Sequence, residues 1–338
     1  MKIKIDGYEY TDFNDITVNL SLDSIASTFS FVARYNNRNN EHRKLFRPLS
    51  FHTVEIFDDN KKLMLTGTIL SHSFSSTSSP NLVRLSGYST PGILEDCTIP
   101  LNNYPLESLN RSLKEITEKL ISPYNLILKI DSSVKNEVDT IYEKSVASPT
   151  ESVKDYLSKL AAQRNVIISH NAQGNLVFFR PNVSSTPKHF FNEESDISMN
   201  MSINGQQLHS EISVIRQPSN DDSQVSLSDS ALNRNVLLFR PKVNVLSSGK
   251  SVDTKKAAEN KLAEELKSIS LNVSTSGFLD LLPGDIVEVQ NREIFLSQKV
   301  KFMVSSIVVK ENEKGVNSSL NLVLPETFSG EIPEIIFS

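Results

Sequence analysis

The chain has 338 residues, of which 38% are hydrophobic and 22% charged, and its formal net charge at pH 7 is −5. This length supports two to four domains with hydrophobic cores, and the composition excludes a disordered or membrane-embedded protein. The acidic balance disfavours a nucleic-acid-binding protein, which normally carries a basic patch, but it would suit the wall of a channel that DNA only passes through.

The single cysteine, Cys97, excludes an internal disulfide and a cysteine-based zinc site within one chain. Residues 1–5 alternate charged and apolar side chains, so we expect a first strand there and not a signal peptide. No apolar run approaches the roughly 18 residues of a membrane span. These features predict synthesis in a reducing cytoplasm.

Short alternating stretches dominate the first hundred residues. Turn-forming segments such as residues 58–60 and 75–80 separate them. Several short strands with turns between them are typical of a small barrel or sandwich, so residues 1–100 are predicted to form a first β-barrel domain. The expected strands are residues 16–22, 29–33, 53–57, 63–70 and 82–85.

A helical pattern begins near Pro105 and is expected to end at Pro123. Its apolar positions recur at steps of three and four: Leu106, Leu109, Leu113, Ile116 and Leu120. A second helix is predicted to start at residues 148–151, where Ser148 can cap it, Pro149 suits its first turn and Glu151 can return a hydrogen bond. The side chains expected to be buried by this helix are Val153, Tyr156, Leu157, Leu160 and Ala161.

With a strand at residues 126–130 and a hairpin at residues 166–179, residues 101–181 are predicted to be an α/β domain. Strand patterns return after a polar connection, so residues 182–338 are predicted to be a second β-barrel domain. The polar segment 217–230 is predicted to be a mobile loop. The expected strands of this half include Ile212, Val214 and residues 236–239, 271–273, 286–289, 299–310 and 319–324.

One helix is predicted to interrupt the second half, over residues 253–269. Asp253 can cap it. Its narrow apolar stripe is expected to comprise Ala258, Leu262, Leu266 and Ile269.

The two β-rich ends of the chain resemble each other. Pro48 precedes Val54-Glu55-Ile56, and Pro283 precedes Val287-Glu288-Val289. In each, the two β-branched residues are expected to face one side of a strand and the acid the other. The pattern alone leaves a duplication and a chance match equally open.

The sequence shows no complete catalytic or metal-binding pattern. Residues 87–90 resemble the start of a nucleophile elbow, but Pro91 stands where that motif needs glycine. Cys97 has no nearby histidine to activate it. The histidines lack metal-ligand spacing, so no catalytic residue, cofactor or metal is predicted. They are His42, His52, His72, His170, His189 and His209.

Residues 82–100, LVRLSGYSTPGILEDCTIP, resemble the signature of the Mu-type tailed-phage baseplate hub family, also called the late control gene D family. That family is related to the hub domains of contractile injection systems and type VI spikes. The signature positions, for which the resemblance implies a structural role, are Gly87, Leu94, Asp96, Cys97 and Pro100. Tyr88 stands where the family usually has a basic residue. Arg47-Pro48 and residues 320–328 extend the resemblance to both ends of the chain.

The resemblance implies a mainly β, α+β fold with two similar barrel domains joined by α/β elements. It further implies a trimeric structural hub, not an enzyme, that adapts a hexameric tail tube to a trimeric spike around a central channel. The location would be the tail baseplate of a virion, after synthesis in the cytoplasm of a bacterial host. The expected partners are further copies of the chain, the tube protein, the central spike protein and other baseplate proteins, with DNA only in passage. A tail-tip cell-wall or glycan hydrolase and a carbohydrate-binding module are the alternatives.

Overall fold

The computed structural model describes residues 1–76, 81–195, 197–216, 228–246, 254–331 and 337. The chain divides into two compact units. Unit 1 comprises residues 1–179, 276–279 and 307–318, and unit 2 comprises residues 180–275, 280–306 and 319–338. The secondary structure is mainly β, as the sequence predicts.

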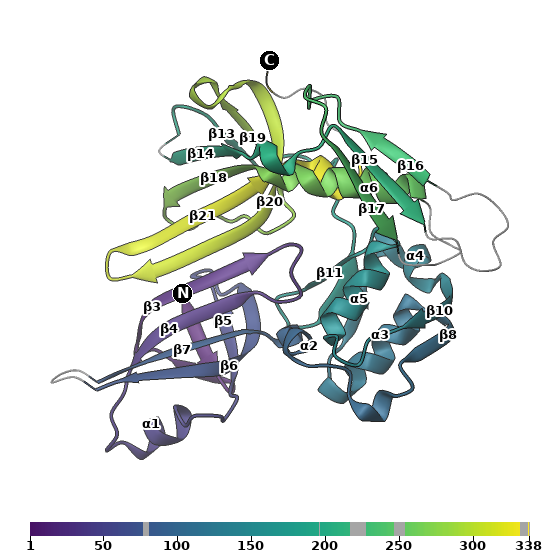
Figure 1. The fold of residues 1–338 in the computed structure, drawn as a ribbon. Coiled ribbons are helices and arrows are strands. Elements are labelled where there is room, and N and C mark those ends of the chain that lie inside the picture. Colours follow the sequence, from purple (N-terminus) through teal and green to yellow (C-terminus); the bar gives the residue numbers. More distant parts are fainter. Residues whose placement is uncertain (77–80, 196, 217–227, 247–253, 332–336, 338) are drawn as a thin grey trace. The chain divides into compact units, whose positions relative to one another are not determined.

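Unit 1 begins with an antiparallel β module (Figure 1). Its strands lie in the order β3-β4-β7-β6-β5-β1-β2. Alternation places one face of each strand in the core, so that Ile16, Val18, Phe31 and Ile56 are buried. The elements are β1 (Lys2–Ile5), β2 (Tyr8–Tyr10), β3 (Phe13–Ser21), β4 (Thr28–Arg34), α1 (Asn40–Leu45), β5 (Thr53–Phe57), β6 (Leu63–Ser75) and β7 (Leu82–Ser89).

The rest of unit 1 is an α/β region with one hydrophobic core, to which α3 and α5 contribute their apolar faces. β10 pairs with β8, and β12 lies between β11 and β9. The predicted hairpin of residues 166–179 is confirmed as β11 and β12. The elements are α2 (Ile93–Asp96), β8 (Glu107–Ser112), α3 (Leu113–Ile121), β9 (Leu128–Ile130), α4 (Lys135–Asp139), β10 (Ile141–Val146), α5 (Val153–Ala162), β11 (Ile167–His170) and β12 (Leu176–Phe179).

The two helices that the sequence predicts in this region, α3 and α5, start later than expected. Ser112 caps α3 by accepting a hydrogen bond from the N–H of Glu115, whose side chain bonds back to the Ser112 N–H. The preceding residues pair with β10, so Leu109 is an exposed strand residue and not part of a helix. Likewise Ser152, and not Ser148, caps α5. The five side chains predicted to be buried by α5 are all buried.

Unit 2 contains a second β module and a smaller layer. In that layer, α6 packs against the three-stranded sheet β16-β15-β17 and buries Ile212, Val214 and Leu262 (Figure 1). The elements are β13 (His189–Phe191), β14 (Ser198–Ile203), β15 (Glu211–Arg216), β16 (Ser228–Leu232), β17 (Pro241–Leu246), α6 (Thr254–Glu265), β18 (Ile269–Ser276), β19 (Ile286–Asn291), β20 (Leu296–Asn312) and β21 (Gly315–Val323).

Three predictions for this half are corrected. α6 ends at Glu265, and Ile269 opens β18 because its side chain continues the buried alternation of that strand. Residues 236–239 form no strand, and Leu237–Phe239 are exposed; pairing with β15 begins only at Pro241. Residues 228–230 of the predicted loop belong to β16, while residues 217–227 and the predicted cap Asp253 lie outside the described residues.

The two β modules repeat one strand order. The N-terminal module is β1-β5-β6-β7-β4-β3, and the C-terminal module is β13-β19-β20-β21-β18-β14. We rank the strands of each module by their order along the chain, leaving out β2. Both sheets then have the strand order first, fourth, fifth, sixth, third, second. One difference is that β1 pairs with β5 antiparallel, whereas β13 pairs with β19 parallel. A shared order of six strands favours the duplication that the short sequence pattern left open.

Local contacts agree with this equivalence. Val54 and Val287 are fully buried, and Glu55 and Glu288 point the other way, as predicted. The carbonyl two residues before each valine accepts a backbone hydrogen bond from the fifth strand. Ile69 donates to His52 and Val304 donates to Asp285, each at 2.9 Å.

The described strands do not close into the two predicted barrels. Closure would require the first-ranked strand to pair with the second-ranked strand. In the N-terminal module β1 pairs instead with β2, and β3 lies next to β20, whose residues 307–312 belong to unit 1. Each module is therefore an open sheet. Within the described chain, the end strands of the N-terminal module pair with β2 and β20, whereas β13 and β14 pair only with strands of their own module.

Candidate functional site

The signature segment starts at a close crossing of strands in unit 1. Gly87 in β7 lies opposite Phe29 in β4 and Ile69 in β6. A Cβ atom at this position would lie 1.8 Å from the Thr68 carbonyl oxygen and 2.9 Å from the Phe29 ring. A backbone oxygen cannot move aside without breaking the sheet, so only glycine fits.

Tyr88 then anchors the turn that follows β7. The turn consists of a 3-10 helix, Thr90–Gly92, and the short helix α2. A Cβ at Gly92 would lie 2.4 Å from the Tyr88 ring, so glycine makes room for that ring. The Tyr88 hydroxyl donates to Oδ2 of Asp96 at 2.6 Å. Burial, followed by this hydrogen bond, raises the pKa of Tyr88, which keeps the hydroxyl neutral and donating.

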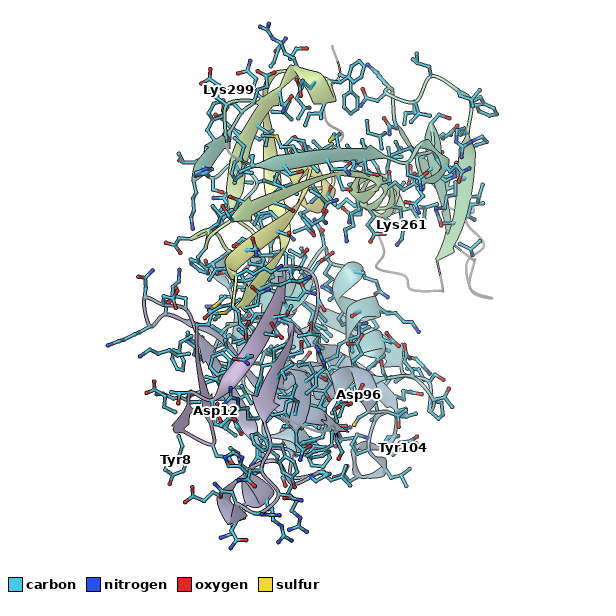
Figure 2. The ribbon with its side chains drawn as sticks, turned by 90° about the vertical axis from the view of Figure 1, so that its left-hand side faces the viewer. Tyr8, Asp12, Asp96, Tyr104, Lys261 and Lys299 are labelled. Carbon is cyan, nitrogen blue, oxygen red and sulfur yellow. The ribbon has the colours of Figure 1, made fainter. Side chains whose placement is uncertain are left out.

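The remaining signature residues connect α2 to α5. Leu94 is fully buried in the core of the α/β region. The carbonyl of Cys97 accepts a hydrogen bond from the Val153 N–H at 3.0 Å, at the first residue of α5. Pro100 caps the next 3-10 helix, and exposed Asp96 lies at the surface of unit 1 (Figure 2). The signature residues thus follow one path, from a strand of the β module to a helix of the α/β region.

A second connection, between distant parts of the sequence, was not foreseen. Ser27 and Ser89 exchange hydrogen bonds: the Ser27 N–H donates to Ser89 Oγ at 3.0 Å, and the Ser89 N–H donates to the Ser27 carbonyl at 2.8 Å. Nδ1 of His170 lies 3.2 Å from the Ser24 carbonyl, so this nitrogen must carry the proton. Nε2 of His170 then accepts from the Ser27 hydroxyl at 2.7 Å.

A serine hydroxyl that donates to a histidine is the arrangement of a nucleophile and its base. Here Ser27 and Ser89 are buried, and a backbone carbonyl stands where a triad has a carboxylate. Burial lowers the pKa of His170, so the ring is neutral near pH 7. The cluster therefore joins the segment just before β4 to β7 and β11 in unit 1, and nothing about it favours chemistry on a substrate.

Other classes of site gain no support from the described part of the chain. Within it, no group of three or more histidine, cysteine, aspartate or glutamate side chains could hold a metal ion. None of its helices is both long enough and apolar enough to cross a bilayer.

Comparison with known proteins places the signature segment in context. Residues 91–180 match the family model described as the second domain of gp44-like baseplate hub proteins. The baseplate hub protein gp44 of Escherichia phage Mu is 24% identical over 184 residues, which is 54% of this chain. The match spans 46% of the Mu protein, so less than half of that protein is compared.

Solved structures show that the fold extends over nearly the whole chain. The 43 kDa tail protein of prophage MuSo2 from Shewanella oneidensis has a TM-score of 0.79 at 17% identity, with 96% of this chain and 98% of that chain covered. The c3393 protein of E. coli has a TM-score of 0.61 at 10% identity, with 99% and 80% covered. That protein is described as a type VI secretion component with structural similarity to the phage T4 tail proteins gp27 and gp5. The predicted resemblance to Mu-type baseplate hubs is confirmed.

The crossing at Gly87 predicts a large loss of stability for Gly87→Ala. Because the new methyl group would meet the Thr68 carbonyl, we expect the free energy of unfolding to fall by about 3 kcal/mol. Urea denaturation followed by circular dichroism measures this. The control is Gly205→Ala, where a Cβ has no neighbour within 4 Å and the change should stay below about 0.5 kcal/mol. Equal losses of stability from the two substitutions would contradict the conclusion that only glycine fits at position 87.

The half-buried His170 predicts a pH dependence of stability. Because the pKa of His170 is lower in the folded state than in the unfolded chain, the unfolded chain binds the proton first as the pH falls. Stability should therefore fall progressively as the pH drops below about 6.5, the ordinary pKa of a histidine in the unfolded chain. His170→Gln should remove that part of the slope in urea titrations at several pH values. An unchanged slope in the His170→Gln variant would refute the prediction.

Proposed function

We propose that this chain is the structural hub of a tail baseplate, in a phage or a related contractile particle. Three copies would close a ring around a central channel and adapt a hexameric tail tube to a trimeric spike. The observation that carries the proposal is the repeated strand order of the two β modules. Two similar modules in each of three copies give six similar positions, so one trimer can offer sixfold contacts on one side and threefold contacts on the other.

The partners follow from this geometry. They are two further copies of the chain, the tube protein, the spike protein and other baseplate proteins. DNA would only pass through, which agrees with a formal net charge of −5 because a like charge discourages adhesion. The match to the gp44-like second domain and the similarity to phage tail proteins support this role.

The proposal includes the division of the chain that the sequence suggested. Residues 1–100 and 182–338 would be the repeated β domains, and residues 101–181 would be the α/β domain that connects them. The signature residues Gly87, Leu94, Asp96, Cys97 and Pro100 would hold the first β domain and the α/β domain together. Their role would be structural, because their contacts are packing, backbone hydrogen bonds and the side-chain hydrogen bond from Tyr88 to Asp96.

No observation favours the hydrolase or the carbohydrate-binding alternative. The proteins matched above are described as tail, baseplate hub or secretion-system components, not as hydrolases. The chain has no tryptophan, the side chain that most often forms a sugar-stacking platform.

The hub proposal predicts a fixed stoichiometry with the spike. The chain should be purified alone and together with the spike protein encoded in the same particle, and the masses measured by light scattering. We expect three copies of the chain in the complex, whether or not the free chain is already a trimer. The spike alone serves as the control. A stoichiometric complex that holds a single copy of this chain would refute the proposal.

A further inference from the structure

The fifth strand of the C-terminal module is long enough to have two partners along one edge. In β20, residues 296–303 pair with β19. The distal residues 307–312 belong to unit 1, where β20 lies next to β3. The N-terminal amine of Met1 forms an ion pair with Glu311, which fixes the same distal segment in unit 1.

This contact completes β3, the second-ranked strand of the N-terminal module. β3 pairs with β4 on one edge and with β20 on the other. Its inward side chains Ile16, Val18 and Leu20 are buried, with 7% or less of their surface exposed. A strand with both edges paired has no free backbone groups to expose.

Among the described residues, the equivalent segments of the other pair of strands are unpaired along one edge. β6 is the fifth-ranked strand of the N-terminal module; residues 63–68 pair with β5, but within the described residues 70–75 pair only with β7. β14 is the second-ranked strand of the C-terminal module, and in the described chain it pairs only with β18. Its side chains are less covered than those of β3: Met201 is half-buried and Ile203 is 50% exposed.

Neither open edge has the protection that exposed edges normally carry. Soluble proteins place charged residues or proline on a free edge strand to prevent pairing with other molecules. Residues 70–75, LSHSFS, and residues 198–203, SMNMSI, contain no charge and no proline. Phe74 is 43% exposed, and Nε2 of His72 is buried without a hydrogen-bond partner. These segments have the composition of strands that are covered in the working assembly.

We propose that β14 of one copy pairs with the distal half of β6, residues 70–75, in the next copy. The contact would repeat between chains what β3 and the distal half of β20 make within a chain. The partner of each open edge is a second copy of the chain, because the contact within the chain also joins a second-ranked strand, β3, to a fifth-ranked strand, β20. Each copy has one edge of each kind, so the contact is head-to-tail and can close into a ring. This inference rests on the proposed hub function and specifies how its ring closes.

Hydrogen–deuterium exchange tests the pairing without knowledge of its register. The amides of residues 70–75 and 198–203 are compared between the monomer and the trimer, the latter formed by the chain alone or on its spike. We expect at least about tenfold slower exchange in both segments of the trimer, since new backbone hydrogen bonds form there. A trimer in which both segments exchange as in the monomer would overturn the inference and leave the hub function standing. A chain that stays monomeric alone and on the spike would overturn both.

A matched pair of variants provides a second test. Met201→Lys places a charge on β14, and Leu232→Lys places one on β16, an edge strand outside the proposed contact where Leu232 is 56% exposed. Because a lysine would be buried without a partner only in the β14 contact, Met201→Lys should raise the concentration needed for trimer formation by at least about tenfold. Leu232→Lys should leave that concentration unchanged. Equal effects of both variants, each checked for folding by circular dichroism, would contradict the proposal.

Discussion

The need of every strand to satisfy two rows of backbone hydrogen-bonding groups determines how this chain is organised. A six-stranded open sheet leaves its end strands with one row unpaired, and exposed rows invite association with other molecules. In the N-terminal module, β1 is completed by β2 and β3 lies against β20. The C-terminal module has no strand equivalent to β2 among its described residues, and β13 pairs parallel with β19. The ends of the two modules are therefore completed differently, although the six core strands follow one order.

The signature segment has a separate role: it connects the β module to the α/β region. Gly87 allows β6, β7 and the Phe29 ring to approach closely, and Gly92 accepts the ring of Tyr88. The peptide carbonyl of Cys97 then contacts the first turn of α5. Ser27, Ser89 and His170 join the same two regions by a buried hydrogen bond between the serines and a part-buried one between Ser27 and His170. These residues act through packing and through hydrogen bonds inside the fold, which is why a signature of such residue types need not indicate catalysis.

Sequence periodicity located most strands of the N-terminal module and the buried helix faces. It missed strands such as β8, β10, β13, β14 and β17, and it failed at boundaries that depend on tertiary pairing. The leucines from Leu106 to Leu120 have helical spacing, yet pairing with β10 keeps residues 107–112 extended until Ser112 and Glu115 form a capping box. Residues 236–239 are apolar enough for a strand, but no neighbouring strand pairs with them within the described chain, so they remain exposed. The Ser27–His170 contact spans 143 residues, and no local pattern encodes it. The sequence indicated the repeated strand order only through the similar segments around the buried valines Val54 and Val287.

The two versions of the edge contact differ in what they cost to form. When β3 lies next to β20, both strands belong to one chain, so the contact requires only the closure of a long loop, whose entropy grows slowly with length. When β14 meets β6 of another copy, association also loses translational and rotational freedom, about 4–15 kcal/mol by general estimates. A charge or proline on either open edge would add to that cost, whereas an uncharged edge with half-buried methionines gains apolar burial on pairing. The absence of protective charges from residues 70–75 and 198–203 is thus the sequence feature expected where assembly, and not chain connectivity, must complete the sheet.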